Sequence, residues 1–108
     1  MLNENPVYEA IVIGVGTAVS TTAAVLAHER LHYVIGTLIG RELDTELAAV
    51  TGDDIASVQA TARQLISDKN DRAYAIGTAY DDDTNHGTVA AEQQRWLVQV
   101  QGWEHAGN

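Results

Sequence analysis

Residues 24–39, which read AVLAHERLHYVIGTLI, fit two kinds of secondary structure, and each gives a different architecture. With the two-residue period of a strand, one side of the segment is mostly apolar: Val25, Ala27, Leu31, Tyr33, Ile35 and Ile39. With helical spacing, another apolar stripe is present: Leu31, Val34, Ile35 and Leu38. Two features favour the strand, and we predict it: β-branched residues are frequent, and Gly36 and Gly40 interrupt the helical pattern.

Three more strands are predicted on either side of this segment. Residues 7–19 are dense in valine, isoleucine and threonine, which suit a pleated surface. Residues 73–80 and 88–103 form the arms of a hairpin, since Trp96, Val98 and Val100 share one face of the second arm and Gln99 and Gln101 share the other. The hairpin tip, 81–83, consists of three aspartates, and we interpret it as solvated because it lacks the alternating ligand pattern of a calcium loop.

A helix is predicted to begin after Gly52, where Asp53 or Asp54 can cap it and its apolar residues follow at helical spacing. Residues 68–71 form its exit loop, and residues 41–50 form a short helix before it. The predicted fold is therefore a single α+β domain, residues 1–108, with the order β-β-α-β-β. Its antiparallel sheet is made of two long hairpins packed on one main helix.

The chain carries a strong excess of negative charge, with 15 acidic residues, six basic residues and a formal net charge of −9. Molar salt would screen the resulting repulsion, and the composition resembles that of proteins from extreme halophiles and their viruses. The charge disfavours direct nucleic-acid binding, which depends on lysine and arginine. Residues 10–27 are uncharged but rich in glycine, serine and threonine, so we predict no membrane segment.

The motif with the clearest chemistry is His28-Glu29-Arg30-Leu31-His32, which matches H-E-x-x-H. On a helix its two histidines share one face and can bind zinc, and Glu29 can serve as general base. On a strand, Glu29 points away from both histidines and the catalytic geometry is lost. With the strand predicted here, we interpret the histidines as surface residues, and we predict no catalytic residue, metal or cofactor.

Residues 25–30, VLAHER, resemble the active-site helix of membrane-linked zinc peptidases. Glu42 and Glu46, with the residues up to Asp53, are similar to the segment that supplies the third ligand in that group. The resemblance implies His28, His32 and Glu42 as zinc ligands and Glu29 as the base. A minimal zinc metallopeptidase is therefore the main alternative function.

The predicted order of strands and helix resembles the tail-terminator and tail-completion proteins of long-tailed viruses. Three segments match: Pro6-Val7-Tyr8, Tyr80-Asp81-Asp82-Asp83 and Trp96-Leu97-Val98-Gln99-Val100. The resemblance implies a non-enzymatic protein that forms homo-oligomeric rings at the tail or neck of a virion. Trp96, Trp103 and Tyr8 are the candidate interface residues.

The leading prediction is therefore a structural protein located in the virion of a halophilic virus, with other virion proteins as partners. A salt-adapted soluble binding module, in the cytoplasm of a halophilic cell, is a further alternative.

Overall fold

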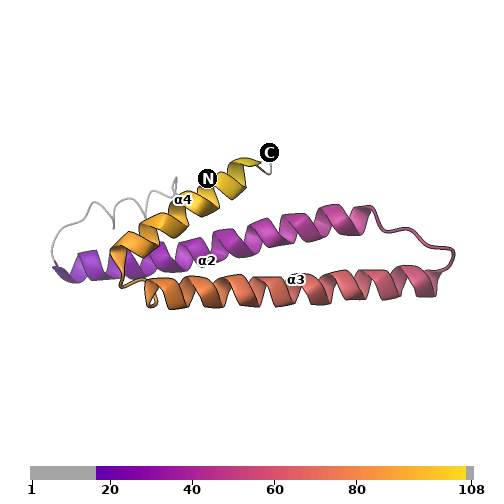
Figure 1. The fold of residues 1–108 in the computed structure, drawn as a ribbon, viewed down its shortest axis with the longest axis horizontal. Coiled ribbons are helices and arrows are strands. Elements are labelled where there is room, and N and C mark those ends of the chain that lie inside the picture. Colours follow the sequence, from indigo (N-terminus) through magenta and orange to yellow (C-terminus); the bar gives the residue numbers. More distant parts are fainter. Residues whose placement is uncertain (1–16, 107–108) are drawn as a thin grey trace.

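The computed structural model describes residues 17–106, and in this part of the chain all regular structure is helical. Helix α2 spans Thr17–Ala48, α3 spans Ile55–Thr84 and α4 spans Ala90–Ala106. Figure 1 shows α2 and α3 as a long antiparallel hairpin, with the shorter α4 lying across one end of it. α4 contacts both long helices. The predicted α+β fold with an antiparallel sheet is wrong, because the described residues contain no strand.

The segment 24–39 is the middle of α2, so the predicted strand is wrong. All four residues of the helical stripe are buried, and so are Ile39 and His28; the six, at 2–7 % exposure, are His28, Leu31, Val34, Ile35, Leu38 and Ile39. Two residues of the alternating pattern, Val25 and Tyr33, are 53 % and 66 % exposed. The core consists of Tyr80 and Val100 together with five residues of this segment: Leu31, Val34, Ile35, Leu38 and Ile39. Burial along a 3.6-residue period therefore outweighs the weak strand preference of β-branched residues.

Helix α3 begins where the sequence predicts and ends much later. Asp54 is the N-cap, with φ −149° and ψ 170°, and its carboxylate accepts a hydrogen bond of 2.8 Å from the Ser57 N–H. The predicted exit loop at 68–71 and the predicted strand at 73–80 are both wrong, because α3 continues to Thr84. The aspartates of 68–71 are exposed, so they interrupt no buried face.

Helix α4 replaces the strand predicted at 88–103. Val98 is 57 % exposed, whereas Val100 is 2 % exposed, so the alternation of Trp96, Val98 and Val100 does not describe one buried face. Trp96 and Trp103 lie seven residues apart, which places them on the same face of a helix. Both are partly buried and pack against the core, so within this fold the two tryptophans hold α4 on the hairpin.

Two further predictions concern the ends of α2. Residues 41–48 continue α2 and are not a separate helix. The strand predicted at 7–19 lies mostly outside the described residues, as does Tyr8, and the part from Thr17 onward is helical. The strand order that suggested a tail terminator is therefore absent from residues 17–106, and it no longer supports a role in a virion. Within the same residues, no helix has the length and hydropathy needed to cross a bilayer.

Candidate metal centre

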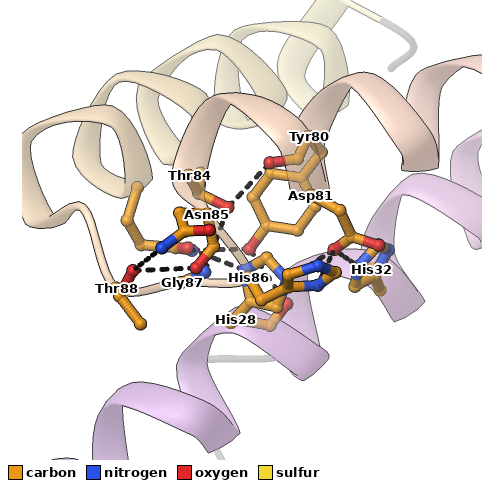
Figure 2. Close-up of polar contacts among 10 residues, drawn as sticks. His28, His32, Tyr80, Asp81, Thr84, Asn85, His86, Gly87 and Thr88 are labelled. Atoms are coloured by element: carbon orange, nitrogen blue, oxygen red, sulfur yellow. Dashed lines mark hydrogen bonds and ion pairs between the residues drawn. The ribbon is translucent and has the colours of Figure 1, made fainter.

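His28 and His32 of α2 and Asp81 of α3 converge on one point beside the end of the hairpin that α4 covers (Figure 2). One carboxylate oxygen, Asp81 Oδ1, lies 2.7 Å from His28 Nε2 and 2.6 Å from His32 Nε2. The three donor atoms are within 4.8 Å of one another. Helical spacing explains the histidine pair, because residues four apart share one face.

A directional chain of hydrogen bonds fixes the ring of His28. The backbone C=O of His28 can only accept, so the Tyr80 hydroxyl donates to it at 2.9 Å. That hydroxyl therefore accepts from the Gln93 amide nitrogen, Nε2, at 2.6 Å. The amide oxygen of Gln93 then faces His28 Nδ1 at 2.9 Å, and because this oxygen can only accept, the Nδ1–H of His28 donates the hydrogen bond. His28 is consequently protonated on Nδ1.

This assignment determines what the other ring nitrogen of His28 can do. A neutral imidazole protonated on Nδ1 carries a lone pair on Nε2. This lone pair faces the Asp81 carboxylate at 2.7 Å, a repulsive arrangement unless a second proton or a metal ion lies between them. A histidine that ligates a metal characteristically donates its other N–H to a fixed acceptor, as His28 does to Gln93.

Packing holds His28 in place from two further sides. The ring stacks on Tyr80, with centroids 4.3 Å apart and an interplanar angle of 18°, and the side chain is 2 % exposed. Gly87 lies against it with φ +94°, and a Cβ at this glycine would come within 2.8 Å of the His28 Cβ. The site therefore depends on residues from α2, α3, α4 and the turn between α3 and α4.

Asp81 is held in its charged form. Burial acts to raise the pKa of its carboxyl, but hydrogen bonds and charge interactions with His28 and His32 outweigh burial, and the pKa is lowered. Its side chain is 30 % exposed and that of His32 is 29 % exposed, so this side of the site is open to solvent. An ionised carboxylate beside two imidazoles is a donor set for a transition metal such as zinc and is unsuited to calcium.

The third ligand implied by the peptidase resemblance, Glu42, does not belong to this site. It lies ten residues after His32 on the same helix, about 15 Å along the axis at the rise of an α-helix. Its carboxylate accepts instead from Arg72 at 3.2 and 3.4 Å and from Lys69 at 3.3 Å. Glu29, the base of the motif, follows His28 on α2 and is exposed.

Sequence reasoning missed the residues that complete the site. Asp81 was interpreted as a hairpin tip, and Tyr80 and Gln93 were given no role in it. The sequence contains two signals: the Asp81–Asp83 run offers three carboxylates, and His86 follows it closely. Neither signal identifies a ligand until residues 24–39 are placed on a helix.

A family model matches residues 19–87, more than half of the chain. The chain belongs to the family described as bacterial protein of unknown function (DUF922). The matched segment contains His28, His32 and Asp81 and ends at Gly87, so in this DUF922 chain it includes all three candidate ligands. No curated protein and no solved structure matches the chain.

Proposed function

We propose that this DUF922 protein is a zinc-dependent hydrolase that cleaves peptide bonds. The observation that carries the proposal is the convergence of His28 Nε2, His32 Nε2 and Asp81 Oδ1. The other ring nitrogen of His28, Nδ1, is hydrogen-bonded to Gln93. This arrangement uses the H-E-x-x-H motif on a helix, the context in which the motif has catalytic meaning.

The donor set fits zinc. Catalytic zinc sites use three protein ligands of nitrogen and oxygen type and leave one position open, and the partly exposed His32 and Asp81 leave such an opening. Donor atoms within 4.8 Å of one another can reach a shared ion at about 2 Å with small side-chain movements. The Asp81 carboxyl, whose pKa is lowered, needs no proton removed before it binds a metal, and the ring of His28 is already oriented by Gln93.

Glu29 is the residue expected to act as general base, accepting a proton from the water molecule that attacks the substrate. A bound zinc ion supplies a water molecule with a pKa lowered to about 7. In the H-E-x-x-H arrangement the glutamate between the histidines accepts the proton of that water. Glu29 is exposed, so solvent and substrate can reach it. The resemblance of residues 25–30 to the active-site helix of zinc peptidases supports peptide bonds as the substrate class.

The first test is metal binding. Purified protein is stripped with a chelator and titrated with zinc against a chromophoric competitor. We expect one zinc per chain, and we expect Asp81→Asn to weaken affinity by roughly 100-fold or more, beyond the effect typical of residues that only support a ligand. Glu42→Gln is the matched control and should bind as the unmodified protein does. Absence of zinc binding, or equal binding by the Asp81→Asn variant, contradicts the proposal.

The second test is hydrolysis, with fluorescein-labelled casein as the probe. Glu29→Gln should remove cleavage and leave zinc affinity within a few-fold, because the glutamate acts on water and is not a ligand. Glu46→Gln, on the same helix but paired with Lys69 at 2.6 Å, is the control. Cleavage by the Glu29→Gln variant at the unmodified rate contradicts the assigned role.

A further inference from the structure

We infer that His86 is a substrate-binding residue whose imidazole N–H donates a hydrogen bond to the carbonyl oxygen of a substrate seated at the metal centre. The inference rests on the proposed function and assigns a role that neither the H-E-x-x-H motif nor the ligand set covers.

The position of His86 is the first argument. Three imidazoles surround Asp81 Oδ1, at 2.7 Å from His28, 2.6 Å from His32 and 3.8 Å from His86. Their side-chain exposures rise in the same order, from 2 % through 29 % to 76 %. His86 therefore stands on the side from which solvent, and a substrate, reach the carboxylate.

His86 lies beside the ligand set and not within it. The group of donor atoms that fall within 4.8 Å of one another contains His28, His32 and Asp81 but not His86. The distance of 3.8 Å between His86 Nδ1 and Asp81 Oδ1 is also longer than a hydrogen bond. A catalytic zinc site needs only three protein ligands, and His28, His32 and Asp81 supply them, so the third imidazole, His86, is available for substrate.

The backbone conformation is the second argument. His86 has φ +57°, between Asn85 at +47° and Gly87 at +94°. A left-handed conformation is unfavourable for a residue with a Cβ, and such residues cluster at functional sites. The turn imposes it through main-chain bonds: the His86 N–H donates to the Asp81 C=O at 2.9 Å, and the Val89 N–H donates to the Thr84 C=O at 2.9 Å.

The turn is also anchored to the metal centre itself. Gly87 contacts the His28 side chain so closely that no Cβ fits, and the Gly87 N–H donates to Thr84 Oγ1 at 3.1 Å. Figure 2 shows the turn and the three imidazoles together. The fold therefore holds His86 at a fixed place beside the opening of the site.

An imidazole in this place has a specific use. In its neutral form it presents one N–H donor, which can point to an oxygen of the bound substrate. Donors aimed at an oxygen that gains negative charge during acyl transfer change kcat by about 10²–10³-fold. His86 is thus assigned to the substrate oxygen, Glu29 to water, and His28, His32 and Asp81 to the metal.

The test separates the imidazole from the backbone. His86→Gly removes the ring and suits the positive φ, so the variant is expected to fold, which a thermal melt followed by circular dichroism checks. His86→Asn retains a donor and tolerates the same conformation. Asn85→Gly is the matched control, because it removes a side chain from the neighbouring left-handed position.

The probe is acetohydroxamate, a small zinc-binding compound with a carbonyl oxygen, titrated calorimetrically into zinc-loaded protein. His86→Gly should weaken its binding about tenfold, the effect of one hydrogen bond of typical strength, and leave zinc affinity within threefold. His86→Asn should recover part of the loss, and Asn85→Gly should match the unmodified protein.

Any result that differs from these expectations contradicts either the role of His86 or the proposed function. Unchanged acetohydroxamate binding by the His86→Gly variant refutes the inference and leaves the metal centre intact. A fall in zinc affinity of tenfold or more makes His86 a metal ligand and refutes its role as a substrate donor. Unmodified protein that binds no zinc refutes the proposed function and this inference with it.

Discussion

The two ends of the α2–α3 hairpin differ in what holds them together. At the end covered by α4, Tyr80 and Thr84 are fully buried, and His28 and Val100 are each 2 % exposed. Toward the other end, no residue from 41 to 79 is buried. Figure 1 shows the end of the hairpin where α2 connects to α3 reaching beyond α4. The candidate metal centre lies at the buried end, where packing and hydrogen bonds can fix side-chain positions.

The part of the hairpin without buried residues, 41–79, is called the far end, and it carries a cluster of ion pairs. Lys69 contacts Glu46 at 2.6 Å and Glu42 at 3.3 Å, and Arg72 contacts Glu42 at 3.2 Å. Partly exposed ion pairs of this kind each contribute about 0–1 kcal/mol and are screened by salt. The change in the free energy of unfolding that a substitution causes should therefore be several-fold larger at the buried end than at the far end.

Two tyrosines on α3 give the largest contrast. Tyr80→Ala removes a fully buried ring from the core, and we expect it to lower the free energy of unfolding by about 3–5 kcal/mol. Tyr74→Ala, at a site 77 % exposed, should change it by less than about 0.5 kcal/mol. Urea denaturation followed by circular dichroism measures both.

Tyr80→Phe keeps this comparison measurable if the alanine variant does not fold. It retains the ring and removes only the hydroxyl that joins Gln93 to the His28 C=O, with an expected cost of about 1–3 kcal/mol. Equal stability of the Tyr80→Phe variant and the unmodified protein would show that the hydrogen-bond chain does not stabilise the buried end.

Two glycines should respond to alanine with opposite signs. Gly87→Ala places a Cβ 2.8 Å from the His28 Cβ at φ +94°, and we expect a loss of about 1–3 kcal/mol together with weaker zinc binding. Gly36→Ala meets nothing within 4 Å on α2 and should stabilise the protein by up to about 1 kcal/mol. Denaturation midpoints of both variants test this, and two changes of the same sign would contradict it.

The elements that sequence predicts correctly are those with local causes. Asp54 caps α3 through a hydrogen bond to Ser57, three residues away, and this signal is visible in the sequence. Residues 24–39 are ambiguous because the choice between strand and helix depends on which stripe α3 and α4 bury. No local preference reports that contact, and the frequent β-branched residues favour the wrong alternative.

The residues of the site also form two groups: those related by local spacing in the sequence, and those that only the packing of the helices brings together. His28 and His32 form a pair through helical spacing alone, so the motif identifies them once the helix is known. Asp81 and Gln93 lie 53 and 65 residues from His28, and only the packing of three helices brings them to it. Glu42 is near in sequence but remote in space, because α2 continues without a break.

The Gln93 amide gives the next prediction, which concerns the metal centre more than stability. Gln93→Leu removes the acceptor that holds the proton on His28 Nδ1, and we expect zinc affinity to fall about 10–100-fold. Long-range ¹H–¹⁵N spectra of the metal-free protein should show His28 protonated on Nδ1 before the substitution and not after it. Gln94→Leu, at the exposed neighbouring residue, is the control, and unchanged His28 spectra in the Gln93→Leu variant would contradict the assignment.

The smallest effect is expected at the far end, in the pH dependence of stability. Burial acts to raise the pKa of Glu42, but Lys69 and Arg72 outweigh it, so the folded-state pKa lies below the ordinary value of 4.5. The ionised carboxylate therefore stabilises the fold above pH 4.5, and this contribution is lost as the pH falls through the folded-state pKa.

Glu42→Gln should accordingly cost less than about 1 kcal/mol at neutral pH, and less still in molar salt. Below pH 4.5 the variant and the unmodified protein should converge in stability, because protonation removes the same charge. Urea midpoints at neutral and acidic pH, with the exposed Asp44→Asn as control, provide the measurement. A loss at neutral pH as large as that of Tyr80→Ala would mean that charge fixes the far end as firmly as packing fixes the metal centre, and the contrast between the two ends would not hold.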